Sequence, residues 1–212
     1  MKLQFRTLPA IITALLLSSP GSTQAPTPTP FSADTQMTSE RAGGREMAGK
    51  IYVGEGHMRW ESQGGMGAPG GTGVMIINFA TGIADMIMPE QKVYMEFGAD
   101  QPGRRGPAAS LQDPFDPNNP CANQPDTTCK KIGVETVNGR TCDHWEVTHQ
   151  GDVANMWIDQ KIHFPTKTVT KDSKITLTNI KEGEPDPSLF QIPAGYLKMD
   201  MGAMMGGRPP QQ

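Results

Sequence analysis

The fold of this chain is decided by a stretch that reads Asn155-Met156-Trp157-Ile158-Asp159, continues through Phe164-Pro165 and a β-branched run at 167–170, and closes with Leu189-Phe190-Gln191-Ile192-Pro193-Ala194-Gly195-Tyr196. β-branched and aromatic residues favour strands. The pattern predicts strands at 154–159, 167–170 and 174–180, followed by a short helical turn at 187–190.

The residues before this stretch repeat the strand signal. Phe31, Ala33, Thr35 and Met37 alternate with polar residues, and a period of two predicts a half-buried strand. The dipeptide Asn138-Gly139 favours a type I′ turn and predicts a hairpin between strands at 132–137 and 140–149. Further strands are expected near 47–53, 57–61, 74–79, 83–88 and 92–97. About ten strands and no long helix indicate a mainly β, meandering fold with a few short helical turns.

The N-terminus has the features of a secretory signal. Lys2 and Arg6 precede a short apolar core at 8–17 and small residues at 18–25. Ten or so apolar residues are too few to span a bilayer, so we expect a signal peptide over 1–25, cut after Ala25 or near Gly21. No cysteine lies at this junction. The expected location is therefore the periplasm or the medium, with no lipid anchor and no membrane span in the mature chain.

The rest of the chain divides by composition. A Pro/Thr spacer at 26–30 precedes one β domain at 31–197, and a Met/Gly/Pro tail at 198–212 is expected to be disordered. Within the domain, 98–131 forms a long Pro/Gly-rich loop, in which only 108–112 favours a helical turn. The formal net charge of −3 predicts no nucleic-acid partner.

The chain has three cysteines, and export permits a disulfide. Cys121 and Cys129 flank a polar loop and are the preferred pair. Cys129 with Cys142 is the second choice, and either pairing leaves one thiol over.

Several of these motifs resemble the LolA-like superfamily of periplasmic lipoprotein and lipid carriers. The matching elements are the Trp-Ile-Asp strand, the Phe-Pro turn, the strand end Thr178-Asn179-Ile180 and the Phe…Pro-Ala-Gly close; 139–147 resembles a branch without assigned function. The resemblance implies a single curved antiparallel sheet that forms a half-open barrel, lined by apolar residues and lidded by helices. This chain departs from the carriers because its spacer leads directly into a strand and no lid helix is evident.

The expected strand faces and the resemblance together predict a binding face for a hydrophobic small molecule or an acylated protein. Methionine is unbranched and polarisable, so it suits a pocket for flexible acyl chains. The alternative is that the same side chains fill a closed core, as in a structural envelope module without a ligand. The predicted lining consists of Met37, Ile51, Val53, Met58, Trp60, Met86, Met95, Phe97 and Trp145.

Other chemistry is weaker in this sequence. The Gly-x-Gly-x-x-Gly match at 65–70 contains Pro69 and leads into a strand rather than a helix, so no nucleotide cofactor is expected. Cys142, His144 and Glu146 share one face of a strand and are an alternative metal site. The thioethers of the tail offer a second one for Cu(I), which would make the chain a metal-handling protein. The tail thioethers are Met199, Met201, Met204 and Met205.

No catalytic motif is present, and no cofactor is expected. The sequence contains neither a Gly-x-Ser-x-Gly elbow nor a His-Glu-x-x-His pattern. Folding can pair Asp85 with Glu96, or Asp143 with Glu146, but no local feature sets either pair as acid and base. The chain is therefore interpreted as a non-enzymatic carrier or sensor module.

Overall fold

The computed structural model describes residues 28–40, 43–54, 56–63, 72–98, 116–122, 124 and 126–199. The expected signal peptide, the glycine motif at 65–70, the expected helical turn at 108–112 and the tail beyond Met199 lie outside these residues. Within them no helix combines the length and the hydropathy that a membrane span requires. The strands are β1 (Phe31–Ser39), β2 (Arg45–Gly54), β3 (His57–Gln63), β4 (Thr72–Asn78), β5 (Ile83–Met88), β6 (Val93–Phe97), β7 (Thr127–Val137), β8 (Arg140–His149), β9 (Asp152–Asp159), β10 (Phe164–Val169), β11 (Ser173–Glu182) and β12 (Leu197–Lys198).

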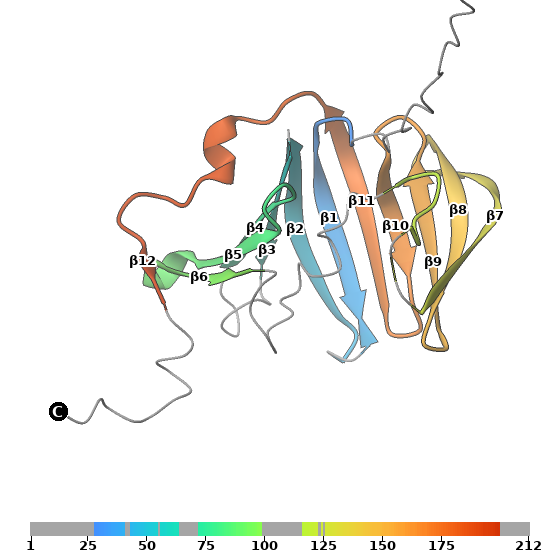
Figure 1. Cartoon of the computed structure of the whole chain (residues 1–212), viewed down its shortest axis with the longest axis horizontal. Coiled ribbons are helices and arrows are strands. Elements are labelled where there is room, and N and C mark those ends of the chain that lie inside the picture. The colour runs from blue at the N-terminus through green and yellow to red at the C-terminus, as the bar shows by residue number, and fades with distance from the viewer. Residues whose placement is uncertain are drawn as a thin grey trace, which may run out of the picture.

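The described strands form one open sheet in the order β12-β6-β5-β4-β3-β2-β1-β11-β10-β9-β8-β7. Two meanders, β1 to β6 and β7 to β11, join where β1 pairs with β11. Figure 1 shows the segment after β11, a central strand, crossing to the edge of the sheet that is far from β7, where β12 lies beside β6. The predicted mainly β fold with a single antiparallel sheet is confirmed, with the parallel pair β12–β6 as its one exception among the described strands.

Three local expectations differ from the structure. β7 begins at Thr127 rather than Ile132, because 127–131 pair with β8, so the loop expected to reach 131 ends earlier. A 3₁₀ turn, η2 (Pro89–Gln91), connects β5 and β6, between strands for which no helical turn was predicted. Lys198, which the sequence placed in the tail, belongs to β12 and is paired with Tyr94 of β6. The helical turn at 187–190 is confirmed as η3 (Pro187–Phe190).

The preferred disulfide is present. Cys121 and Cys129 are bridged, with their Cα atoms 5.8 Å apart, and Cys142 is left as a buried free thiol. The bridge connects the loop before β7 to the beginning of β7, which lies at the edge of the sheet. It thereby helps to hold the paired start of β7 in place.

Cross-strand pairing assigns each residue to one of two faces, because directly opposed residues point to the same side of a sheet. We call the side that carries Phe31 the inner face and the side that carries Arg59 the outer face. Three rows of paired residues cross the inner face. The Phe31 row is Phe31, Val53, Met58, Ile77, Ala84 and Phe97; the Trp60 row is Ala33, Ile51, Trp60, Met75, Met86 and Met95; the Trp145 row is Trp145, Met156, Thr168, Ile175, Met37 and Met47.

The largest buried cluster lies on the inner face and shows which way the sheet curls. It contains Ala84 of β5 and also Ile162 from the turn between β9 and β10, although five strands separate β5 from β10. Packed inner-face side chains thus run from β5 to this turn, and β10 contacts β1 across the intervening strand β11, which bends the sheet toward the inner face. Phe31 and Phe164 add an edge-to-face ring contact at 5.2 Å between centroids. The inner face is therefore the concave one.

The C-terminal segment covers the outer face of β4 to β6. Phe190, Ile192 and Tyr196 pack on Val74, Ile76 and Ile87. Arg59 Nη1 donates a 2.9 Å hydrogen bond to the carbonyl of Leu189. The amides of Leu197 and Met199 then bond to Lys92 and Tyr94, at 3.0 and 2.8 Å, so β12 covers the edge of β6.

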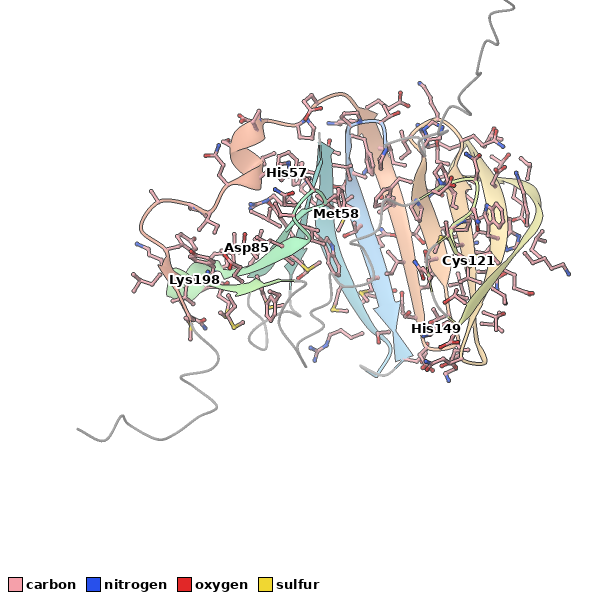
Figure 2. The ribbon with its side chains drawn as sticks, in the orientation of Figure 1. His57, Met58, Asp85, Cys121, His149 and Lys198 are labelled. Carbon is pink, nitrogen blue, oxygen red and sulfur yellow. A yellow bond between two sulfur atoms is a disulfide. The ribbon has the colours of Figure 1, made fainter. Side chains whose placement is uncertain are left out.

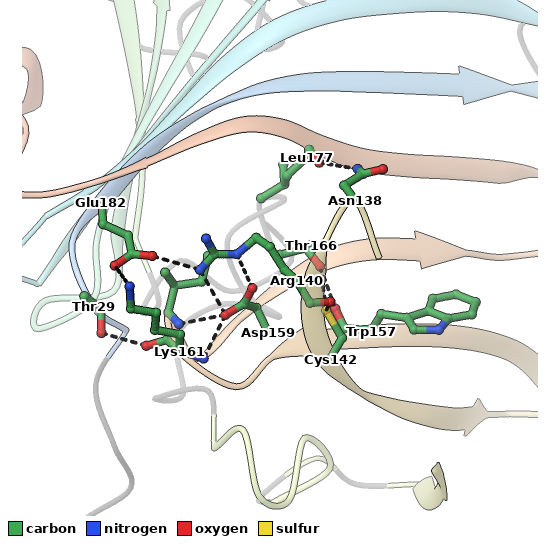
Figure 3. Close-up of polar contacts among 11 residues, drawn as sticks. Thr29, Asn138, Arg140, Cys142, Trp157, Asp159, Lys161, Thr166, Leu177 and Glu182 are labelled. Atoms are coloured by element: carbon green, nitrogen blue, oxygen red, sulfur yellow. Dashed lines mark hydrogen bonds and ion pairs between the residues drawn. The ribbon is translucent and has the colours of Figure 1, made fainter. Parts of the chain in front are cut away.

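A polar cluster positions the turn between β9 and β10 (Figure 3). Asp159, 1% exposed, pairs with Arg140 and accepts hydrogen bonds from the amides of Lys161 and Ile162, at 2.8 and 3.0 Å. Glu182 joins the cluster through Arg140 at 3.1 Å and Lys161 at 2.7 Å. These bonds fix the turn that inserts the fully buried Ile162 against the inner face.

Any side chain at Gly49 is expected to destabilise the sheet. A Cβ atom there would lie 2.1 Å from the carbonyl oxygen of Glu61 and 2.8 Å from Thr35 Oγ1, so Gly49→Ala must open the β2–β3 pairing. We expect a loss of about 2–3 kcal/mol in the free energy of unfolding, measured by urea denaturation. Gly133→Ala is the control, because a Cβ there meets nothing within 4 Å. Equal stability of the two variants would contradict the close approach at Gly49.

Candidate functional site: the inner face of the sheet

All residues of the predicted lining lie on the inner face. The register places them in the three rows, although they come from six different strands. The face assignment of each side chain agrees with its place in the alternating pattern. Whether this face binds a ligand is a separate question, which depends on how much of it is covered.

Exposure divides the predicted lining into two groups. Ile51, Val53, Met58 and Trp145 are buried, with at most 8% of their surface exposed. The other members are partly exposed: Met37, Trp60, Met86, Met95 and Phe97. The Phe31 row is covered almost to its end, because Phe31, Val53, Ile77 and Ala84 are fully buried. The open part of the inner face is therefore the far end of the Trp60 row and most of the Trp145 row.

Sequence reasoning missed several residues of this open surface. Met47, Val93, Met156 and Ile175 are partly exposed and lie on the inner face by register. The signal for Ile175 was already present, since it alternates with polar neighbours in its strand, whereas Met47 lies between Glu46 and Ala48. Met156 is opposed to Trp145, which only the pairing of β8 with β9 reveals.

The methionines of the described strands all lie on the inner face. Met58, Met75 and Met88 are buried, whereas the others are partly exposed. Figure 2 labels Met58 within the sheet and its neighbour His57 toward η3, where the His57 ring lies 5.6 Å from that of Phe190. The partly exposed methionines are Met37, Met47, Met86, Met95 and Met156.

Two polar atoms on the inner face are buried without a hydrogen-bond partner among the described residues. They are Ser62 Oγ and Trp145 Nε1, whose residues are 4% and 8% exposed. A further donor on this face, Trp60 Nε1, makes a long bond of 3.4 Å to Thr35 Oγ1. Lys131 Nζ lies 5.8 Å from the centroid of the Trp145 ring. The apolar face thus holds donors that a hydrogen-bond acceptor on a ligand can satisfy.

The alternative metal residues Cys142 and His144 are engaged elsewhere, on the outer face. Burial raises the pKa of the Cys142 thiol, which opposes the thiolate that a metal needs. Both ring nitrogens of His144 lie 2.8 Å from acceptors, Glu135 Oε1 and Asn155 Oδ1, and the ring stacks on Trp157. No group of three metal-binding side chains forms among the described residues. Met199 is bonded through its backbone to β6, and Met201 lies outside the described residues.

The carboxylates Asp85 and Glu96 are indeed brought together, as cross-strand partners on the outer face. Burial, and then the charge of Glu96, raises the pKa of Asp85, while Lys198 opposes the shift. Lys198 Nζ pairs with Glu96 at 2.8 Å. Asp85 shares a row with Arg59 and Ile76, which contact the C-terminal segment. The pair therefore lies beneath the chain's own C-terminal segment.

A protein-family model matches most of the described sheet. Residues 31–163 match the model of a domain of unknown function, DUF4412, which is well over half of the chain. This chain belongs to the DUF4412 family. The match ends within the turn that carries Ile162, so β10 to β12 of this DUF4412 protein lie outside it. No curated protein matches the sequence.

Solved structures share the architecture at low sequence identity. An uncharacterised conserved protein from Thermus thermophilus has a TM-score of 0.54 and 12% identity over 81% of this chain and 90% of that one. PNGF-II has a TM-score of 0.50 and 11% identity, and the DUF4412 chain spans only 31% of its length. These likenesses establish the fold alone. The similar structures also include a LolA superfamily protein from Nitrosomonas europaea, with a TM-score of 0.39, 8% identity and coverage of 77% and 90%.

Proposed function

We propose that this DUF4412 protein is an exported, non-catalytic carrier or sensor module whose inner face takes up a hydrophobic ligand. The observation that carries the proposal is a concave face that its own side chains leave partly uncovered. The partly exposed residues there include five methionines, Trp60 and Phe97. Partly open apolar surface at a concave face is the usual property of a ligand site.

The shape of the open surface favours an acyl chain. The Trp145 row crosses neighbouring strands from β8 to β2, a distance of about 24 Å at about 4.8 Å per strand. A flexible chain that lies along this row would contact Met156, Ile175, Met37 and Met47 in turn. Methionine side chains adapt their shape to such a ligand more readily than branched ones. A fatty acyl group, free or attached to a protein, is the ligand class that fits.

The orphaned donors favour a ligand with a polar end. An acceptor such as a carboxylate or an ester carbonyl would satisfy Trp145 Nε1 or Ser62 Oγ, which have no partner among the described residues. Each atom is covered in this structure, so the acceptor reaches it only after the covering groups shift. An amphiphile therefore fits better than a pure hydrocarbon.

Export enters this proposal from the sequence. Lys2, Arg6 and the apolar core at 8–17 favour secretion. The disulfide Cys121–Cys129 belongs to an oxidising compartment. We therefore place the mature chain in the periplasm or outside the cell, where the acyl chains of lipids and lipid-modified proteins must be kept out of water.

The first test is organic extraction of the purified chain, followed by mass spectrometry. We expect a stoichiometric lipid in the extract. Titration with a fluorescent fatty acid analogue then measures affinity. The variant Met37→Gln/Met47→Gln, which changes two opposed residues of the Trp145 row, should bind at least about tenfold more weakly, which corresponds to about 1.4 kcal/mol. Its stability should change little, because both side chains are only partly buried.

The control is Val153→Gln. Val153 is 45% exposed, and its register places it on the outer face. This variant removes exposed apolar surface away from the site and should bind the analogue normally. A blank extract, together with no uptake of the analogue by the unmodified chain, would overturn the proposed function. Equal weakening by both variants would assign uptake to general surface hydrophobicity.

A further inference from the structure

We propose that the inner face is also an oxidation switch. A peroxide converts its partly exposed methionines to sulfoxides, and the modified face releases its hydrophobic ligand. This inference rests on the proposed function, and it names how ligand binding at that site is regulated. The residues concerned are Met37, Met47, Met86, Met95 and Met156.

The first argument is the segregation of methionine. The outer face of the described strands carries none, whereas every strand of the inner face from β1 to β6 contributes at least one. Strands ordinarily favour β-branched and aromatic residues at such positions. Oxidation of thioethers therefore changes the ligand face and leaves the outer face of the strands untouched.

The second argument is the split in exposure. Met58 and Met75 are 6% and 4% exposed, and Met88 is 9% exposed. Buried Met75 has a more exposed methionine beside it in register, since Met86 is opposed to both Met75 and Met95. Susceptibility to oxidation follows access, so the ligand-contacting sulfurs react first and the core sulfurs are spared. The fold then survives a modification that changes the binding surface.

The chemistry needs only a peroxide. Its O–O bond breaks, one oxygen forms a bond to the sulfur, and the peroxide is reduced by two electrons to water as the thioether is oxidised to the sulfoxide. The product is a polar group where a flexible apolar one stood. Two reactive sulfurs, Met37 and Met47, are directly opposed on β1 and β2, and Met86 and Met95 are opposed on β5 and β6. Each oxidised pair places two polar groups side by side under the ligand.

Methionine sulfoxide is reversible, because reductases return it to the thioether. Reduction therefore restores the apolar binding surface. An irreversible modification of an exported protein would only inactivate it.

The test treats the full mature chain with graded hydrogen peroxide. Peptide mass spectrometry should show sulfoxide at the partly exposed positions before Met58, Met75 and Met88. Affinity for the fluorescent fatty acid analogue should fall at least about tenfold, and reduction by methionine sulfoxide reductases should restore it. Circular dichroism should show an unchanged sheet throughout.

The matched control replaces the five partly exposed methionines with leucine, which keeps the face apolar and cannot form a sulfoxide. This variant should bind the analogue and keep its affinity after peroxide. Equal affinity of the native chain before and after oxidation would overturn the switch and leave the proposed function standing. Unfolding of the oxidised chain, or loss of affinity in the leucine variant after peroxide, would also overturn it. Failure of the native chain to bind the analogue before any peroxide treatment would overturn both the switch and the proposed function.

Discussion

Replacing Asp159 with alanine is expected to destabilise the fold by about 3–5 kcal/mol, the range found when one member of a buried ion pair is removed. The carboxylate is 1% exposed, and it binds the Arg140 guanidinium and the amides of Lys161 and Ile162. Its loss removes the acceptor of the two amides and one of the two carboxylates that pair with Arg140, and it frees the turn that places Ile162 in the core (Figure 3). Urea denaturation measures the change.

An exposed ion pair provides the control for this variant. Lys50 and Asp34 pair at 3.0 Å with side chains 57% and 38% exposed, so Lys50→Ala should leave the denaturation midpoint almost unchanged. Similar midpoints for the two variants would contradict a structural role for the Asp159 cluster.

The stability of the native chain should depend on pH through Asp159. Burial alone would raise its pKa, but hydrogen bonds from Arg140 and from the amides of Ile162 and Lys161 outweigh burial and lower the pKa. A lowered folded pKa stabilises the fold above the unfolded value of about 3.9, and this contribution is lost as the pH falls through the folded pKa. The gap between the native chain and Asp159→Ala should therefore narrow below about pH 4.

Phe31→Ala is expected to cost about 3–5 kcal/mol in the free energy of unfolding. Phe31 is fully buried at the start of the Phe31 row, and its ring meets Phe164 edge to face. The substitution leaves a cavity at the point where β1, β2 and the turn after β9 meet. Urea denaturation with an unchanged slope would assign the loss to the folded state.

Phe97→Ala is the comparison, because Phe97 ends the same row and is only partly buried. We expect it to cost clearly less stability and to weaken ligand uptake instead. A cost below about 1 kcal/mol for Phe31→Ala would mean that the inner face is not packed at this end. In that case the Phe31 row would itself be available to a ligand.

These expectations divide the inner face into a structural and a functional part. Ile162 and Phe164 close the Phe31 row, and the Asp159 cluster holds them there. The open ends of the Trp60 and Trp145 rows contribute less to stability, because their side chains are partly exposed. Variants in the second region should therefore separate binding from folding.

Much of this arrangement was predictable from local patterns. Residues two apart in a strand share a face, so the alternation around Met37, Met58 and Met95 already placed each of them on the apolar side of its own strand. The turn chemistry of Asn138-Gly139 predicted the β7–β8 hairpin, which the structure confirms. The spacing of Cys121 and Cys129 across a polar loop led to the correct disulfide.

Other features were invisible to local patterns. β12 has only two residues and exists because the C-terminal segment crosses Val74, Ile76 and Ile87 and reaches the free edge of β6. Cys142 and His144 do share a face, yet their partners Thr166, Glu135 and Asn155 come from three other strands. Spacing within β8 could not show that these groups were already engaged.

The amino-acid order alone determined which side chains share a face, because that follows from the period of two along each strand. Only the tertiary structure decided which of them are covered. The same residue types are buried in the Phe31 row and partly open in the Trp145 row. The difference arises because the sheet curls until Ile162 and Phe164 reach β1, a contact between residues more than a hundred positions apart in sequence.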